Sequence, residues 1–158
     1  MGVAGSGKTT IGRMVADVLH WPYFEADDFH SPKNKAKMGD GHPLTDADRA
    51  PWLAGIRAKI EECRATGQNA VFTCSALKEQ YRALLGIDKP DTLLVHLTGS
   101  LETILVRVGQ RQGHFMKPEL VQSQFDSLEP PRDALIFDIR LSPEEIVQSI
   151  LLTISGAG

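Results

Sequence analysis

The stretch Gly2-Val3-Ala4-Gly5-Ser6-Gly7-Lys8-Thr9 satisfies the pattern G-x-x-x-x-G-K-[ST] in full. Its glycines let the backbone curl so that several N–H groups point inward at a phosphate chain. Lys8 can then reach the terminal phosphates, and the Thr9 hydroxyl can ligate Mg²⁺. Apolar residues at helical spacing follow at once, so we expect this loop to lead directly into the N-terminus of a helix. The predicted nucleotide site consists of Gly2, Val3, Ala4, Gly5, Ser6, Gly7, Lys8, Thr9 and Thr10.

Length and composition indicate an ordinary folded domain. Of 158 residues, 42% are hydrophobic and 23% are charged, which predicts a single domain over residues 1–158. The net charge of −3 gives no support to nucleic-acid binding. No apolar run approaches the roughly 18 residues that a membrane span needs. Cys63 and Cys74 offer no disulfide framework, so we expect a cytoplasmic protein without a secretory leader.

Short apolar runs alternate with amphipathic helix patterns, which is typical of a mostly parallel sheet covered by helices. Only Met1 precedes the phosphate loop, where a buried central strand normally lies, so the first strand is expected to be missing from this chain. Pro51 is expected in the first turn of its helix, because proline fits poorly in a helix interior. The predicted strands are residues 23–24, 70–74, 93–97 and 135–139, and the predicted helices start near residues 10, 51, 79, 101, 118 and 143.

Two segments do not follow this alternation. Residues 27–50 are polar and interrupted by glycine and proline, and we interpret them as a substrate-binding region. Residues 109–117 carry glycine, arginine and histidine, and we interpret them as a mobile lid. Arg107 and Arg111, four residues apart, are expected to share a helix face that leads into this lid and to reach the transferring phosphate. A solvated helix face is the alternative for these two arginines.

An acidic group follows the first predicted strand, at Glu25 and Asp27. It should therefore lie at a carboxyl end of the sheet, where ligands bind in open α/β folds. Alternation along an extended chain places Glu25 and Asp27 on one side. One of them could hold Mg²⁺ together with Thr9, and the other could accept a proton from a substrate hydroxyl. An ordinary acidic turn is the alternative. The histidines show no metal-ligand spacing.

Longer motifs extend over essentially the whole chain. They are Asp-Asp-Phe-His at 27–30, Asn34, Lys37-Met38, Gly-x-Pro-Leu-x-Asp-x-Asp-Arg-x-Pro-Trp at 41–52, Cys-Ser-Ala-Leu-Lys at 74–78, Tyr81-Arg82, Gly-His-Phe at 113–115 and Gln-Phe-x-x-Leu-Glu-Pro at 124–130. Together they resemble gluconokinases of the P-loop, shikimate-kinase-like group. The resemblance implies an α/β P-loop kinase fold, a three-layer sandwich with a five-stranded parallel sheet and a helical lid. It further implies ATP-dependent phosphorylation of D-gluconate to 6-phospho-D-gluconate with Mg²⁺, commonly by a homodimer.

The resemblance also assigns residues. It implies that Asp27 orients and deprotonates the sugar-acid hydroxyl. Arg49 and Lys78 are then expected to hold the gluconate carboxylate or its hydroxyls, since a guanidinium can bind a carboxylate through two hydrogen bonds. His30 and His114 are expected near the substrate. Lys8 and Arg111 complete the expected catalytic group. Glu25 stands where this family more often has Asp.

Two alternatives stay open from the sequence. One is a truncated, non-catalytic or weakly active gluconokinase-like binding or regulatory protein, suggested by the missing first strand. The other is a related small-molecule P-loop kinase such as shikimate kinase. The Pro-Leu-x-Asp-x-Asp-Arg stretch at residues 43–49 is not typical of shikimate kinases, which ranks that alternative lower.

Overall fold

The structure is a computed structural model that describes residues 1–87, 89–110 and 118–156. Strands and helices alternate along the chain, and every strand predicted from the sequence is present within two residues of its predicted bounds. In chain order the elements are α1 (Lys8–Leu19), β1 (Tyr23–Glu25), the 3₁₀ helix η1 (Ala26–Phe29), α2 (Pro32–Gly39), α3 (Asp46–Ala65), β2 (Val71–Thr73), α4 (Glu79–Leu85), β3 (Val95–Thr98), α5 (Leu101–Gly109), α6 (Pro118–Asp126), β4 (Leu135–Asp138) and α7 (Pro143–Gly156).

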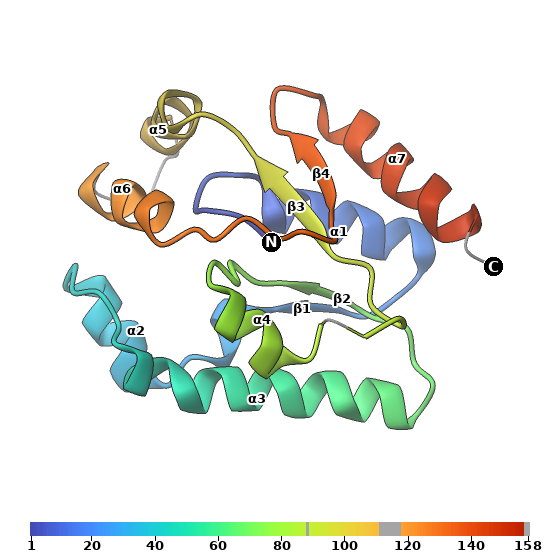
Figure 1. The fold of residues 1–158 in the computed structure, drawn as a ribbon, viewed down its shortest axis with the longest axis horizontal. Helices are drawn as coiled ribbons and strands as arrows, with labels where there is room; N and C mark the ends of the chain where they lie inside the picture. Colours follow the sequence, from blue (N-terminus) through green and yellow to red (C-terminus); the bar gives the residue numbers. More distant parts are fainter. Residues whose placement is uncertain (88, 111–117, 157–158) are drawn as a thin grey trace.

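The strands form two parallel pairs, β1 with β2 and β3 with β4. The chain enters the phosphate loop between these pairs (Figure 1). There the Leu97 amide donates to the Met1 carbonyl at 3.0 Å, and the Gly2 amide donates to the Ser75 carbonyl at 3.3 Å. Within the described residues no strand precedes the loop. The five-stranded sheet implied by the resemblance is therefore wrong for these residues, which form two two-stranded sheets.

Helices cover both sides of the strands, as a three-layer α/β arrangement requires (Figure 1). On one side α1 packs on β1 and β2 and beside α7, and on the other α3 packs on α4 and η1. In the part of the chain that the structure describes, no helix has both the length and the apolar character needed to cross a bilayer. The first core is formed by Val3, Ile11, Val15, Leu97, Ile104, Val108, Val121, Ile139, Ile146, Val147 and Ile150. The second core is formed by Ala26, Trp52, Leu53, Ile56, Ala76, Tyr81 and Leu85.

A capping box sets the start of α3 and corrects one prediction. The Asp48 amide donates to the Thr45 hydroxyl at 3.2 Å, and the Thr45 amide donates to the Asp48 carboxylate at 2.8 Å. This reciprocal pair satisfies amide groups that a helix start otherwise leaves without partners, so α3 begins at Asp46. Pro51 consequently lies inside α3, and the prediction that it occupies the first turn is wrong. The irregular segment predicted over 27–50 is also partly helical, because it contains η1, α2 and the start of α3.

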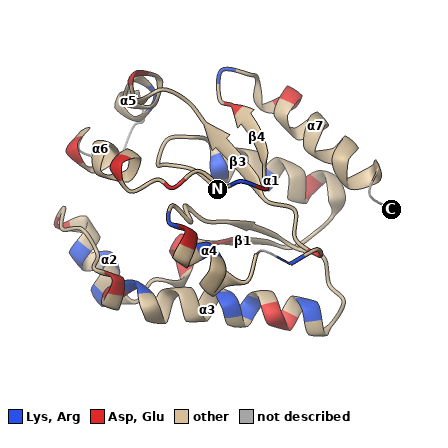
Figure 2. Cartoon of the chain, in the orientation of Figure 1, with Lys and Arg blue, Asp and Glu red and all other residues tan. Residues whose placement is uncertain are grey.

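Charged residues of both signs lie along α3 (Figure 2). They form ion pairs between successive turns, with N–O distances of 2.6 Å for Arg57–Glu61, 2.7 Å for Lys59–Glu62 and 2.9 Å for Arg64–Glu61. Pairs of this kind at a surface each contribute little to stability, typically about 0–1 kcal/mol. The position of α3 therefore depends mainly on the second core.

The close approach of α1 to the β1–β2 pair depends on Gly12. A Cβ atom at this position would lie 2.4 Å from the Thr73 Cγ2 atom and 2.9 Å from the Tyr23 Cε2 atom. Both distances are well below the roughly 3.5–4.0 Å of ordinary carbon–carbon contact. The missing side chain therefore lets α1 lie directly on the strands, which places Lys8 and Thr9 beside the carboxyl ends of β1 and β2.

We predict that Gly12→Ala lowers the free energy of unfolding by about 1–3 kcal/mol, because the added methyl group overpacks the contact with Tyr23 and Thr73. Gly39→Ala is the matched control. Gly39 is also a helical residue, the last one of α2, and a Cβ atom there would meet no atom within 4 Å. The control should be neutral or slightly stabilising. Urea unfolding of both variants measures the difference, and equal stabilities would contradict the packing argument.

Candidate active site

The phosphate loop has the backbone and side chains that an anion site needs. Gly7 is the N-cap of α1 and has φ 94°, a left-handed conformation that glycine adopts without strain. The Lys8 Nζ atom donates to the Val3 carbonyl at 3.0 Å, so the ammonium group lies over the loop. Ser6 is buried, and its Oγ atom has no hydrogen-bond partner among the described residues. An orphaned hydroxyl beside a helix N-terminus fits a site for phosphate oxygens.

Arg107 of α5 lies beside this loop. It borders a pocket of about 90 Å³ together with Thr10 and neighbouring loop residues, and its Nη2 atom donates to the Ile139 carbonyl. The structure thus brings Arg107 to the predicted nucleotide residues. It also brings Gln124 of α6, whose Oε1 atom accepts a hydrogen bond of 2.6 Å from the Ala4 amide. Sequence reasoning included Gln124 in the motif at 124–130 but did not assign it to the site, because spacing along the chain does not show that this residue reaches the loop.

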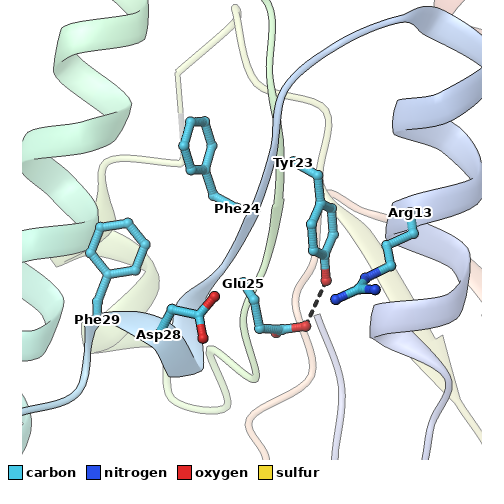
Figure 3. Close-up of a pocket in the computed structure, with 6 residues that line it drawn as sticks. All are labelled: Arg13, Tyr23, Phe24, Glu25, Asp28 and Phe29. Carbon is cyan, nitrogen blue, oxygen red and sulfur yellow. Dashed lines mark hydrogen bonds between the residues drawn. The ribbon is translucent and has the colours of Figure 1, made fainter.

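The two predicted metal ligands, Thr9 and Glu25, meet at the carboxyl end of β1. The Glu25 Oε2 atom accepts hydrogen bonds from the Thr9 hydroxyl at 2.9 Å and the Tyr23 hydroxyl at 2.6 Å. The Oε1 atom accepts from the Thr73 hydroxyl at 2.8 Å. Figure 3 shows Glu25 and Tyr23 joined in this way, with α1 alongside.

The donor set at Glu25 and Thr9 fits Mg²⁺, because the ion prefers oxygen ligands. Over the described ranges no three His, Cys, Asp or Glu residues are placed so that they could hold a metal ion. Mg²⁺ commonly binds through one or two carboxylates together with substrate phosphates rather than in an all-protein cage. Thr9 and Glu25 therefore suit a site that the bound nucleotide completes.

Asp27 lies on η1 and not on the strand. β1 ends at Glu25 and the chain turns at once into η1, so the prediction that Glu25 and Asp27 alternate along one extended segment is wrong. The physical reason is a buried hydrogen bond of 2.6 Å from the Trp52 Nε1 atom to the Ala26 carbonyl. This bond from α3 fixes the turn directly after the strand and leaves the Asp27 side chain exposed.

Cys74 directly follows β2 and carries an unreactive thiol. Burial raises the pKa of the Cys74 thiol to about 11, while the charges of Lys8 and Asp27 act on it in opposite directions. The thiol is neutral near pH 7, which excludes it as a ready nucleophile.

His30 is held next to Asp27 by an aromatic stack. Its ring lies on Trp52 with a centroid distance of 4.4 Å and an interplanar angle of 10°. Burial lowers the pKa of His30; the negative charge of Asp27 opposes this effect, and Lys35 and Arg49 add to it. The Nδ1 atom is buried and has no hydrogen-bond partner in the described part of the chain. A neutral imidazole with a free ring nitrogen therefore lies near the predicted base.

Arg49 and Lys78, the two cations predicted to hold a sugar acid, converge on Asp46. The Asp46 Oδ1 atom lies 3.7 Å from Arg49 Nη1 and 3.6 Å from Lys78 Nζ. The Tyr81 hydroxyl donates to the same carboxylate, and its ring centroid lies 5.8 Å from the Arg49 Cζ atom and 5.5 Å from the Lys78 Nζ atom. The hydrogen bond from Tyr81, with both cations, lowers the pKa of Asp46. One carboxylate thus already fits between the two cations.

Buried Arg82 fixes the loop that carries Lys78. Its Nη1 atom donates to the Ala76 carbonyl at 2.9 Å and to the Leu77 carbonyl at 3.1 Å. Ala76 has φ 43°, a left-handed conformation that is uncommon for alanine, and these bonds help to hold it. The sequence analysis included Tyr81 and Arg82 among the motifs that resemble gluconokinases, but these motifs did not indicate what either residue does.

Two predicted site residues, Arg111 and His114, lie outside the described residues, as does most of the predicted lid at 109–117. α5 ends at Gly109. The expectation that Arg107 and Arg111 share a helix face therefore stays a prediction, and so does the lid.

Comparisons with known proteins agree with these features. Residues 4–154 match the sequence profile of the shikimate kinase family. A probable gluconokinase of Rattus norvegicus is 48% identical over 149 residues, covering 83% of this chain and 80% of the relative. A gluconokinase of Arabidopsis thaliana is 40% identical over 172 residues, covering 99% and 91%. The crystal structure of a gluconokinase from Sinorhizobium meliloti 1021 superposes with a TM-score of 0.87 at 39% identity, covering 99% of this chain and 90% of that one.

The pKa of His30 predicts how stability depends on pH. Because burial lowers this pKa in the folded state, the unfolded chain takes up the proton first, and stability falls as the pH drops below the unfolded value of about 6.5. His30→Phe keeps a ring on Trp52 but cannot bind a proton. We expect the wild type to lose up to about 1.4 kcal/mol more than this variant between pH 7.5 and 5.5. Urea unfolding at both pH values tests this, and equal losses would contradict it.

Proposed function

Because this chain belongs to the gluconokinases within the shikimate kinase family, we infer that it is an ATP-dependent kinase that converts D-gluconate to 6-phospho-D-gluconate. Relatives that carry this name align with most of the chain. The structural observation that carries the substrate assignment is the convergence of Arg49 and Lys78 on one carboxylate. A sugar acid presents the same group to these cations.

We propose that the phosphate loop binds the nucleotide. The amides of residues 2–10 would surround the phosphates at the N-terminus of α1, and the Ser6 hydroxyl would find there the partner that it lacks. Lys8 would bind the terminal phosphates, and Arg107 would neutralise negative charge from the side of α5. Thr9 and Glu25 would hold Mg²⁺, which, when bound, neutralises phosphate charge as the phosphoryl group moves.

We propose that Asp27 orients the acceptor hydroxyl and takes its proton. Its exposed carboxylate lies on a turn fixed by the Trp52 indole, directly after the strand that ends at Glu25. A base so placed can meet a hydroxyl that is directed at the phosphate loop. The free Nδ1 atom of His30 would bind a neighbouring hydroxyl of the substrate.

The carboxylate of gluconate would bind at Arg49 and Lys78. Asp46 now lies between these cations, but at 3.7 and 3.6 Å and with a side chain that is 60% exposed, so its ion pairs are weak. A substrate carboxylate can approach the guanidinium through two parallel hydrogen bonds, which is a stronger arrangement. Tyr81, under both cations, would keep them in place.

Further predictions rest on the sequence. Arg111 is proposed to stabilise the transferring phosphoryl group from the lid at 109–117, and His114 is proposed to contact the substrate there. A homodimer and a cytoplasmic location also stay predictions. The two alternative functions, a non-catalytic relative and a shikimate kinase, are not favoured by the gluconokinases that align with the chain.

The direct test is an ADP-release assay with a panel of acceptors. We expect turnover with gluconate and little with shikimate, glycerate or nucleoside monophosphates. Lys8→Ala should lower the rate with gluconate by orders of magnitude, because it removes the ammonium group from the terminal phosphates. Clear turnover of another acceptor, with none for gluconate, would refute the proposed substrate.

Asp27→Asn tests the proposed base. The amide has nearly the shape of the carboxylate but cannot accept the proton, so kcat should fall by roughly 10²–10⁴ while KM for gluconate stays nearly unchanged. Asp28→Asn is the matched control, since Asp28 is the exposed neighbour on η1 and should retain activity. A change confined to KM would instead assign Asp27 to substrate binding.

A further inference from the structure

Glu25 carries an unusually complete set of hydrogen bonds for a partly exposed carboxylate. Hydroxyl groups of Thr9, Tyr23 and Thr73 all donate to it, at 2.9, 2.6 and 2.8 Å. The Tyr23 and Thr73 hydroxyl oxygens also lie 2.7 Å apart. The carboxylate is therefore bonded by Tyr23 of β1 and Thr73 of β2, and also by Thr9 at the N-terminus of α1.

A count of acceptor positions shows what this arrangement leaves available. A carboxylate offers about four lone-pair directions. Two of those on Oε2 are taken by Thr9 and Tyr23, and one on Oε1 is taken by Thr73. One direction on Oε1 stays available for a metal ion or a metal-bound water.

The residues that hold Glu25 are themselves fixed by packing. Glu25 and Thr73 are directly opposite each other in the β1–β2 register, and Gly12 lets α1 approach Tyr23 and Thr73 closely. The Arg13 Cζ atom lies 5.4 Å from the centre of the Tyr23 ring. Figure 3 shows Arg13 next to Tyr23, across from Asp28 and the two phenylalanines of the same pocket, which has a volume of about 290 Å³.

We propose that Tyr23 and Thr73 are positioning residues that hold the Glu25 carboxylate against Thr9 and so shape the Mg²⁺ site. This inference rests on the proposed kinase function, because it concerns the metal that accompanies the nucleotide. Neither residue touches the reacting atoms. Both act through Glu25, by removing its rotational freedom and by directing its remaining acceptor position.

A purely structural role for these hydroxyls predicts a different result. If they only stabilised the fold, their removal would lower stability and change nucleotide affinity equally with and without Mg²⁺. A positioning role changes only the part of the affinity that depends on Mg²⁺. Comparing the two conditions therefore separates the hypotheses, and ADP suffices as the ligand.

The test uses Tyr23→Phe and Thr73→Val, which remove the hydroxyls and nearly keep the shapes. ADP binding is measured by titration calorimetry in Mg²⁺ and in EDTA. Mg²⁺ should raise the affinity of the wild type for ADP, and we expect this increase to be about tenfold smaller in each variant, which is the typical effect of one hydrogen bond to a charged group. The affinity in EDTA should be unchanged. Thr66→Val is the matched control, because this hydroxyl donates to the Glu62 and Cys63 carbonyls at the end of α3.

A double-mutant cycle shows whether the effect passes through Glu25. In a Glu25→Gln background, Tyr23→Phe should change the Mg²⁺-dependent gain by less than about twofold. A full tenfold loss in both backgrounds, equal losses in Mg²⁺ and EDTA, or no loss at all would each overturn the inference. These titrations need no gluconate. If gluconate is not the substrate, the wild type shows no turnover with it in the activity assay, and that result leaves the titrations and this inference unaffected.

Discussion

The placement of α1 on the β1–β2 pair is the constraint on which the site depends. Gly12 permits it, since any Cβ there would lie 2.4 Å from a Thr73 methyl carbon. Because α1 begins at the phosphate loop, the position of the helix also sets the directions of its free amides and of Thr9. The strand pair carries Glu25 at its end. One packing contact therefore puts the phosphate site and the carboxylate beside it into a single rigid frame.

The side proposed to bind the sugar acid is built by different contacts. There α3 supplies Trp52, which fixes the turn before Asp27, and Arg49, which meets Lys78 at a shared carboxylate. The phosphate loop rests on the first core through Val3, whereas these contacts rest on the second core. The two halves of the site are thus supported by separate cores.

Sequence patterns predicted most of the architecture, and the exceptions have physical causes. The four strands lie within two residues of their predicted positions, because apolar runs and the turns between them are local signals. The start of α3 was predicted too late, since the Thr45–Asp48 capping box outweighs the usual preference of Pro51 for a first turn. The geometry at Asp27 was wrong because a distant indole, that of Trp52, ends the extended segment after Glu25.

The sequence by itself determined the phosphate loop, the α/β alternation and the chemical types of the acidic and basic residues around the site, because these depend on spacing within short segments. Only the tertiary structure decided that Tyr23 and Thr73 hold Glu25, that Gln124 bonds the phosphate loop and that Asp46 lies between the two cations. These contacts join residues that are mostly far apart along the chain. Which of them come within hydrogen-bond distance depends on how helices pack on strands, and spacing along the sequence does not specify that packing.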